Sequence, residues 1–474
     1  MFKQLLMGIL ILLYSVSSLS AGWERTYGSQ CADDGYSVDQ TTDGGYIITG
    51  SWETGPWEDV YLVKTDGNGN VIWENVIGTD TMEAGYSVQQ TTDNGYIVSG
   101  YTSAFGYLDQ IYLIKTTSGG DTSWTKYYGG SGPEFGYSIQ QTVDGGYIVA
   151  GLTGSFGAGG NDVFLIKTDS LGDSIWAKTF GGSYYDQGSS IQQTTDGGYI
   201  ITGRTESYGA GSSDVYLIKT DSIGDTLWTR TFGGSGWDFG KSVHQTTDGG
   251  YIIVGTWSYD YHTGIGDVFL IKTDANGDTV WTRIYGGSNL ERGTSLDQTT
   301  DGGYIITGRT ESYGAGEADV YLIKTDSLGN ILWTRTFGGS EDDWGNSVQQ
   351  TVDGGYIIAG TTYSFGTGYS SVYLIKTDSI GLNVEETILS SPENFSYSIN
   401  YLENKNISFQ ISVTQNSELT LNIYDCAGRW VSTPISGYYS AGIHSIDFQV
   451  ENSGIYFIKL KIDNQIERGK FIVF

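Results

Sequence analysis

The sequence predicts an all-β fold: a seven-bladed β-propeller closed by its N-terminal strand, followed by a small immunoglobulin-like β-sandwich. Two observations carry this prediction: a long repeat that fills most of the chain, and short alternating segments after it. Four short apolar segments in each repeat favour a propeller blade, with a solenoid as the alternative. The repeat is marked by an Asp-Gly-Gly-Tyr element, with Asn in place of the first Gly in the second copy, at Asp43, Asp93, Asp144, Asp196, Asp248, Asp301 and Asp353.

Residues 1–21 have the layout of a cleavable secretory signal peptide. Lys3 precedes an apolar run from Leu5 to Leu13, and small residues lead to Ala21. The run is shorter than the roughly 20 residues that span a bilayer. We therefore expect the signal to be removed and the mature chain to have no transmembrane span.

Composition excludes one class of partner. The chain has 24 basic and 54 acidic residues, a net charge of −30, and such a chain repels nucleic acid. Its 71 Gly, 36 Tyr and 13 Trp suit a turn-rich β protein, and its two Cys cannot form a disulfide framework. We expect a monomer that is stabilised by packing.

Each repeat predicts four strands in order, as the fourth copy shows. A first strand ends at Thr195, and Asp196-Gly-Gly198 forms a tight turn in which Gly supplies positive φ. The second strand runs from Tyr199 to Thr205. The third, Val215 to Thr220, is apolar on both faces, as expected between neighbouring blades, and the fourth contains Trp228.

The two ends of the repeat array predict how the ring closes. The seventh repeat has no Trp strand after Thr377, whereas Trp23–Gly28 matches Trp333–Gly338. If the N-terminal segment supplies the missing strand, no edge is left unpaired. The propeller is then predicted to span residues 22–382.

The same closure predicts where ligands bind. If the donated strand lies at the rim, the first strand of each repeat is innermost, and the loops after the second and fourth strands share one face. Those loops vary between repeats, and variable loops on a rigid scaffold commonly carry function. The candidate binding residues on this face are Trp52, Trp57, Tyr184, Tyr185, Trp237, Tyr259, Tyr261, His262, Asp342, Asp343 and Trp344. The alternative is that these aromatic side chains only fill the loops.

The third and fourth strands, as in Leu217–Asp221 with Gly224 and Trp228, resemble the tryptophan-docking repeat of quinoprotein-type propellers. The resemblance covers about half of each repeat and implies a packing motif. A quinone-dependent dehydrogenase would also need a calcium and cofactor constellation, often with vicinal Cys, which is not visible. We expect no cofactor.

Catalytic and metal motifs are scarce. The turns with Asp66, Asn68 and Asn70, or with Asp274, Asn276 and Asp278, space oxygen ligands as calcium loops do, but no bidentate Glu follows. Asp and Gly in a hairpin turn need no metal, so calcium at these turns is the alternative. Adjacent acids near Asp342 would suit glycoside hydrolysis, although acids in a surface loop are usually solvated. We predict no catalytic residue.

The C-terminal region is predicted to contain a linker, residues 383–398, and a β-sandwich, residues 399–474, built from short alternating strands. Leu421–Val431, Gly442–His444, Ser453–Leu460 and Lys470 resemble the C-terminal sorting domain of type IX secretion cargo. The resemblance implies roles in turns and strands for Asp425, Gly428, Arg429, Gly454, Tyr456 and Lys470, and it implies contact with a secretion translocon. The alternative is a generic immunoglobulin-like module.

Together these features predict a protein of a Gram-negative-type envelope, outside the cell or on the outer-membrane surface. We expect a non-catalytic binding or adhesion module with a possible glycan or surface ligand, because aromatic rings beside acids suit sugars. The alternatives are a glycan-active enzyme that uses the variable-loop face and a purely structural surface protein.

Overall fold

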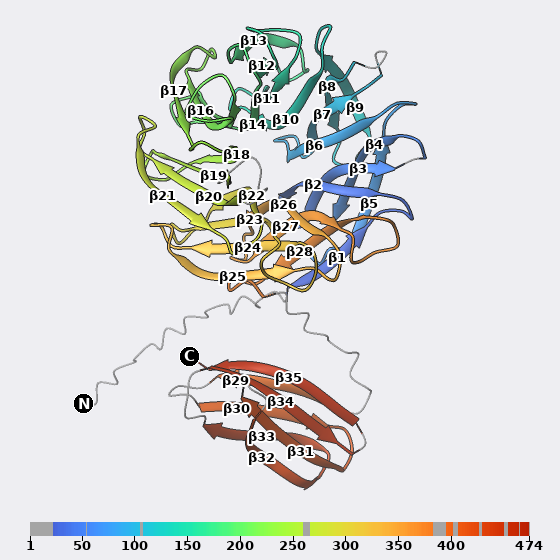
Figure 1. Cartoon of the computed structure of the whole chain (residues 1–474). Helices are drawn as coiled ribbons and strands as arrows, with labels where there is room; N and C mark the ends of the chain where they lie inside the picture. The colour runs from blue at the N-terminus through green and yellow to red at the C-terminus, as the bar shows by residue number, and fades with distance from the viewer. Residues whose placement is uncertain are drawn as a thin grey trace, which may run out of the picture. The chain divides into compact units, whose positions relative to one another are not determined.

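The computed structural model describes residues 22–53, 55–104, 108–258, 266–382, 395–401, 406–425, 429–449, 454–463 and 465–473. The chain divides into two compact units, Met1–Val384 and Glu385–Phe474 (Figure 1). Strands and turns make up both units in these ranges. No helix in the described part of the chain is long and apolar enough to cross a membrane.

The first unit contains seven four-stranded antiparallel sheets within the described ranges, as predicted. The first three blades are blade 1 with β2 (Asp33–Gln40), β3 (Tyr46–Glu53), β4 (Glu58–Thr65) and β5 (Val71–Ile77), blade 2 with β6 (Glu83–Gln90), β7 (Tyr96–Thr102), β8 (Gln110–Thr116) and β9 (Thr122–Tyr128), and blade 3 with β10 (Glu134–Gln141), β11 (Tyr147–Thr153), β12 (Asp162–Thr168) and β13 (Ser174–Phe180).

The remaining blades repeat the same order. They are blade 4 with β14 (Asp186–Gln193), β15 (Tyr199–Thr205), β16 (Asp214–Thr220) and β17 (Thr226–Phe232), blade 5 with β18 (Phe239–Gln245), β19 (Tyr251–Ser258), β20 (Gly266–Thr273) and β21 (Thr279–Tyr285), blade 6 with β22 (Glu291–Gln298), β23 (Tyr304–Thr310), β24 (Asp319–Thr325) and β25 (Ile331–Phe337), and blade 7 with β26 (Asp343–Gln350), β27 (Tyr356–Thr362), β28 (Ser371–Thr377) and β1 (Trp23–Tyr27).

The ring closes through the N-terminal strand. β1 pairs antiparallel with β28 over its whole length, from Trp23 opposite Lys376 to Tyr27 opposite Val372. At the axis, the first and last inner strands also meet, because the Gln40 amide donates to Gln349 Oε1 at 2.8 Å. The predicted closure is therefore confirmed, and it leaves blade 7 with the same four strands as the others.

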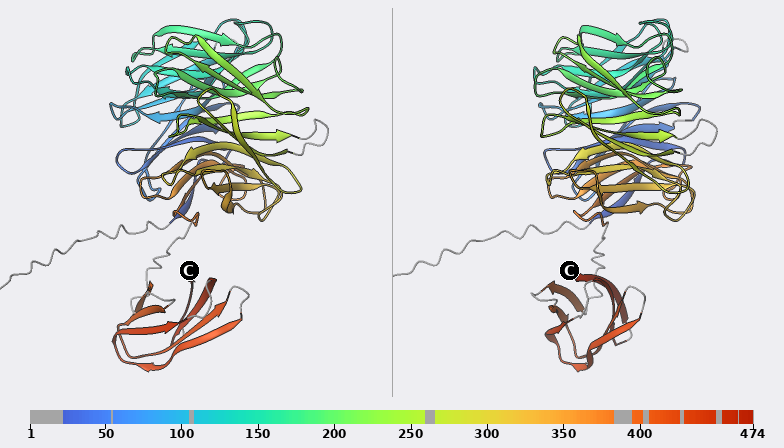
Figure 2. Two further views of the ribbon diagram at one scale, coloured as in Figure 1. Left: turned by 90° about the vertical axis from the view of Figure 1, so that its left-hand side faces the viewer. Right: turned by 60° about the vertical axis from the view of Figure 1, so that its left-hand side comes forward.

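Within each blade the chain runs from the axis to the rim (Figure 1), and Figure 2 shows the same blades from the side. β2, β6, β10, β14, β18, β22 and β26 surround the axis, and β1, β5, β9, β13, β17, β21 and β25 form the rim. Neighbouring inner strands are linked by side chains: the Gln141 amide donates to Gln89 Oε1 at 2.7 Å. This order places the first strand of every repeat where it can line a central channel.

A Trp on each rim strand locks one blade to the next. Trp176 lies edge-on to Tyr199, with ring centroids 6.0 Å apart. It also covers Gly224 in the turn of blade 4, where a Cβ would lie 2.7 Å from the ring, and where φ is 80°. Only Gly fits there, because the turn needs positive φ and the indole needs the space. Six further Trp–Tyr pairs repeat this contact: Trp23–Tyr46, Trp73–Tyr96, Trp124–Tyr147, Trp228–Tyr251, Trp281–Tyr304 and Trp333–Tyr356.

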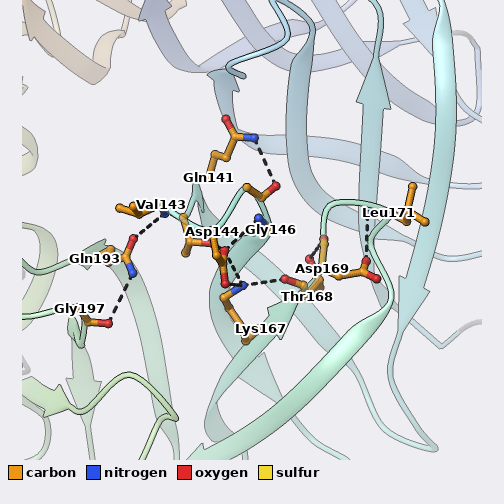
Figure 3. A network of polar contacts seen from close by, with 12 residues as sticks. Gln141, Val143, Asp144, Gly146, Lys167, Thr168, Asp169, Leu171, Gln193 and Gly197 are labelled. Carbon is orange, nitrogen blue, oxygen red and sulfur yellow. Dashed lines mark hydrogen bonds and ion pairs between the residues drawn. The ribbon is translucent and has the colours of Figure 1, made fainter.

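A buried lysine fastens the Asp-Gly-Gly turn of each blade to the third strand (Figure 3). Lys167 Nζ lies 2.9 Å from Asp144 Oδ2 and donates to the Thr168 carbonyl at 2.8 Å. Gln193 of the next blade accepts from the Val143 amide at 3.0 Å. The ammonium is thus held by a carboxylate and a carbonyl, as a buried charge requires.

The second unit is a β-sandwich of two sheets. One contains β29 (Phe395–Tyr401), β30 (Asn406–Val413) and β33 (Gly442–Gln449), and the other contains β32 (Trp430–Tyr439), β31 (Ser417–Asp425), β34 (Gly454–Ile462) and β35 (Gln465–Val473). Residues from both sheets form one core, among them Phe409, Leu421 and Ile458.

Candidate ligand-binding site

One face of the propeller, which we call the loop face, carries the loops between second and third strands and the connections between blades. The two sets touch: the Asp238 amide donates to the Ser213 carbonyl at 2.8 Å, and the Tyr208 hydroxyl donates to the Gly181 carbonyl at 2.7 Å. The inner strands begin at this face. Their first residues therefore surround the mouth of the central channel.

A β-bulge in every inner strand aims one side chain at the channel. In blade 4, Gly188 pairs with Gly203 and Ser190 pairs with Thr202, so Ser189 is an extra residue without a partner in the register. A Cβ on Gly203 would lie 1.8 Å from the Gln187 carbonyl, which shows how closely the two strands approach. Bulges of this kind redirect side chains, commonly near functional sites.

The bulged residue divides the channel into two halves. The scaffold around it is repeated, but the side chain is not: it is Tyr in blades 1 to 3 and Ser, Lys, Thr or Asn in blades 4 to 7. The seven residues in order are Tyr36, Tyr86, Tyr137, Ser189, Lys241, Thr294 and Asn346.

Aromatic rings fill the half of the channel in blades 1 to 3. The Tyr86 ring centroid lies 5.4 Å from that of Tyr36 and 5.3 Å from that of Tyr137. Tyr101 and Phe135 extend the cluster, with their centroids 5.0 Å apart. Rings at these spacings attract one another and exclude other groups, so open space is left on the other side.

A cavity of about 380 Å³ lies in blades 4 to 7. Four of its lining residues are cationic: Arg204, Lys241, Arg292 and Arg309. Further lining side chains are aromatic or neutral and polar: Gln187, Ser189, Phe239, Thr256, Thr294, Trp344 and Asn346. A cationic cavity is unexpected in a chain with a net charge of −30.

Aromatic faces hold two of the arginines. The Arg204 guanidinium carbon lies 4.1 Å from the Tyr185 ring centroid and 5.3 Å from that of Phe239. Arg309 lies over Trp344 at 5.4 Å, and its Nη2 contacts Glu311 at 3.0 Å. Such contacts favour a cation without neutralising its charge.

The other two cations repel their neighbours. The Lys241 side chain is in contact with water in the cavity, but the protein around it displaces much of the water that would stabilise its ammonium charge. Burial, together with the positive charges of Arg204 and Arg292, lowers the pKa of Lys241 to about 8. Burial and the charge of Arg309 likewise lower the pKa of Arg292, although Glu311 acts in the opposite direction. The charge cluster is therefore costly without a ligand.

Acidic groups stand on the far side of the ring, in blade 1. Burial raises the pKa of Asp34, although hydrogen bonds from Thr361 and Tyr36 oppose the shift. Burial and the charge of Asp34 also raise the pKa of Glu58. The ring thus has partly buried acids in blade 1, clustered aromatic rings in blades 1 to 3 and cations in blades 4 to 6.

Some residues that the sequence nominated lie at this cavity. Trp344 lines it, Tyr185 holds Arg204, and Trp237 lies edge-on to Phe239 at 6.0 Å. Others lie elsewhere on the loop face. Trp52 packs on Tyr61 at 4.7 Å, and Trp57 and Tyr184 are exposed. Tyr259, Tyr261 and His262 lie outside the described residues.

One of the two nominated acids, Asp343, serves the scaffold. Asp343 is fully buried, and its Oδ2 accepts hydrogen bonds from the Gly339 amide at 2.8 Å and the Ser364 hydroxyl at 2.7 Å. Asp342 offers its backbone carbonyl to the Tyr363 amide at 2.9 Å. A buried acid begins six further inner strands or immediately precedes one, at Asp33, Glu83, Glu134, Asp186, Asp238 and Glu291.

The calcium-like turns close on themselves. Asp66 Oδ1 accepts from the Asn68 and Asn70 amides at 2.8 and 2.9 Å, and the Asn70 side-chain amide donates to Oδ2 at 2.9 Å. Asp274 Oδ1 likewise accepts from the amides of residues 276 and 278. These hydrogen bonds alone explain why Asp occupies the first position of each turn. Within the described ranges, no group of three or more His, Cys, Asp or Glu residues is arranged to hold a metal.

The binding residues predicted from the sequence include none of the four cations. Arg204 and Arg309 occupy the position after the second-strand Gly, and Lys241 and Arg292 lie beside the first-strand Gly. A column-by-column comparison of the seven repeats would have found them, because these columns vary inside strands that are otherwise repeated. The predicted site was limited to loop residues, whereas these four cations vary at positions beside the strand glycines.

Residues 404–474 match the family model of the secretion system C-terminal sorting domain. The tail is a type IX sorting domain. This confirms the predicted export to the cell surface or extracellular space. In this sorting domain Tyr456 is buried in the sandwich core, Arg429 is exposed, and Asp425, Gly454 and Lys470 lie in strands, with Asp425 opposite Tyr456. Gly428 lies outside the described residues.

Outside the sorting domain, relatives are distant. The chain is 28% identical over 244 residues to the regulatory protein FlaEY of Caulobacter vibrioides, an alignment that covers 45% of this chain and 25% of that protein. The chain thus spans about a quarter of this curated relative.

Similar solved structures include the Pan2 WD40 domain of Neurospora crassa, with a TM-score of 0.46, 11% identity and coverage of 72% of this chain and 89% of that chain. Sqt1 of Chaetomium thermophilum gives a TM-score of 0.44, 11% identity and coverage of 81% and 97%. The propeller assignment rests on the seven sheets and their closure.

Proposed function

We propose that this exported protein is a non-catalytic binding or adhesion module whose ligand occupies the axial cavity of blades 4 to 7. One observation carries the proposal: the cavity is lined where otherwise repeated strands stop repeating. Packing alone would favour the same residue in each blade, because each blade presents the same backbone. The differences between the side chains at the bulge are therefore better explained by ligand binding than by packing of the blades.

The position of the cavity supports the same function. Ligands commonly bind in concave sites on rigid elements, and this cavity lies within the usual size range of about 300 to 1,000 Å³. Its wall is built by inner strands that both neighbouring blades support. An adhesion module benefits from such a wall, because a preformed site loses little entropy on binding.

The hydrolase alternative has less support. It relied on Asp342 and Asp343, and the Asp343 carboxylate is buried among loop hydrogen bonds that recur from blade to blade. A general acid or base must reach the substrate. A turnover assay is nevertheless the direct way to separate binding from catalysis.

The test is a broad glycan and small-molecule binding screen with the mature chain. Ser189→Trp places a bulky ring in the cavity, and Ser222→Trp places the same ring in an exposed turn. We expect ligands bound by the wild type to be retained by Ser222→Trp and lost by Ser189→Trp, with thermal unfolding used to verify the fold. Binding that survives in Ser189→Trp, or conversion of the ligand to product, would contradict the proposal.

A further inference from the structure

We infer that the axial cavity binds an acidic saccharide residue, with the carboxylate or sulfate held by Arg204, Lys241 and Arg292. The inference rests on the proposed function and adds the chemical class of the ligand.

The charge of the cavity wall is unbalanced. Among the described residues, no carboxylate forms an ion pair with Arg204, Lys241 or Arg292. The fourth cation, Arg309, forms an ion pair with Glu311. An oxyanion in the cavity would relieve the repulsion between these cations.

The cationic groups are preorganised to bind an oxyanion. Tyr185 and Phe239 fix the Arg204 guanidinium by contact with its faces, which leaves its N–H edge free to donate. Lys241 projects from the bulge of the next blade, and Arg292 follows in blade 6. Guanidinium and ammonium groups from three blades therefore meet at one cavity. Such donors form the strongest hydrogen bonds with carboxylate, sulfate or phosphate.

The neutral part of the wall indicates what carries the anion. Gln187, Ser189, Thr256 and Asn346 offer hydroxyl and amide groups, which suit a carrier with several hydroxyls. The rings of Phe239 and Trp344 also line the cavity, and apolar sugar faces pack on such rings. A sugar acid combines an oxyanion, hydroxyls and an apolar face in one small unit.

Size and overall charge limit the ligand to a short one. The volume of about 380 Å³ is near the low end for ligand pockets, which suits one or two rings. A long polyanion would meet a chain of net charge −30, and binding such a polymer relies on many cations along its length. The ligand is therefore a chain end or short oligomer rather than the middle of a long acidic polymer.

The experiment is isothermal titration calorimetry of the mature chain with four probes. They are digalacturonic acid, a 6-sulfated galactose, the neutral galactose disaccharide and sodium sulfate alone. We expect the first two to bind at least tenfold more tightly than the neutral sugar and than free sulfate. Lys241→Met and Arg292→Gln should each weaken binding of the acidic probes at least tenfold. Lys178→Met, which removes a rim cation paired with Asp225 at 2.8 Å, should change it less than twofold.

Three results would overturn the inference. Equal binding of neutral and acidic sugars in the cavity would remove the anion requirement but leave the proposed function standing. Sodium sulfate that binds as tightly as the sugar acids would show an oxyanion site without saccharide recognition. Failure of both acidic probes, while the broad screen finds a Ser189-dependent ligand, would exclude this chemical class alone.

Discussion

Arg204 lies over the ring of Tyr185, with 4.1 Å between its guanidinium carbon and the ring centroid. The two residues come from adjacent segments of blade 4, a loop and the second strand, and the Tyr185 hydroxyl donates to Gln187 Oε1 at 3.1 Å. The loop thereby fixes a cation that the strand aims at the cavity. This contact links the variable loops, which the sequence indicated, to the channel wall, which it did not.

Removal of the Tyr185 ring should weaken anion binding without unfolding the protein. A cation–π contact of this kind contributes about 0.5 to 2 kcal/mol, so Tyr185→Ala should raise the dissociation constant of an acidic probe about twofold to thirtyfold. Tyr185→Phe keeps the ring and should stay within about twofold. Calorimetry of both variants measures the difference, and equal affinities for Ala and Phe would argue against a positioning role.

The glycines of two turns should differ in their sensitivity to Ala. Gly224 and Gly197 have similar φ, 80° and 83°, but a Cβ at Gly224 meets the Trp176 ring at 2.7 Å, whereas nothing lies within 4 Å of one at Gly197. Both variants adopt an unfavourable left-handed backbone that costs about 1 to 2 kcal/mol. Gly224→Ala should cost about 1 to 3 kcal/mol more because it overfills the contact. Urea unfolding of the pair isolates the cost of the Trp contact, and equal losses would refute it.

The ease of predicting the propeller and the difficulty of predicting its site have one physical origin. The Trp, Gly and Lys–Asp contacts recur because every blade meets its neighbours in the same way, so seven copies of the sequence reveal the same constraint. Lys241 and Arg204 occupy positions where the scaffold imposes no constraint. Their significance depends on which blades face one another across the channel and on the aromatic cluster that closes the other half, and neither follows from one repeat.

The ion pair between the buried Lys and the Asp of the Asp-Gly-Gly turn should stabilise each blade in mild acid, and this stabilisation should be lost near pH 2. Although partial burial opposes the shift, hydrogen bonds from Thr194, Lys219 and the Gly198 amide lower the pKa of Asp196 from 3.8 to about 2. A pKa that is lower in the folded state stabilises the fold above the unfolded pKa, and the stabilisation is lost as pH falls from about 4 to about 2. Asp43 and Asp93 behave alike.

Asp196→Asn tests the ion pair between Asp196 and Lys219. It removes the titrating group, so the free energy of unfolding should fall less steeply between pH 4 and pH 2 than in the wild type. At pH 7 the variant should be less stable by about 1 to 3 kcal/mol, because the buried Lys219 ammonium loses its negatively charged partner and keeps only neutral acceptors. Urea unfolding at several pH values gives both quantities. The same pH slope in the two proteins would mean that Asp196 does not titrate differently in the folded state.

Binding of an acidic ligand should weaken as pH rises through about 8. The pKa of Lys241 is lowered to about 8 by burial and by Arg204 and Arg292, so its ammonium is charged at pH 7 and largely neutral at pH 9. An anion favours the charged form, and above pH 8 binding must therefore be accompanied by proton uptake. The other ionisable side chains that line the cavity are arginines, and guanidinium groups do not deprotonate in this pH range.

Calorimetry with digalacturonic acid between pH 6.5 and pH 9.5 measures this dependence. Wild-type affinity should be flat below pH 7.5 and fall by up to about tenfold per pH unit above pH 8, with proton uptake visible as a heat that depends on the buffer. Lys241→Arg retains the positive charge throughout and should give a nearly flat profile. A wild-type profile that is equally flat would contradict the prediction that Lys241 contacts the anion and titrates near pH 8.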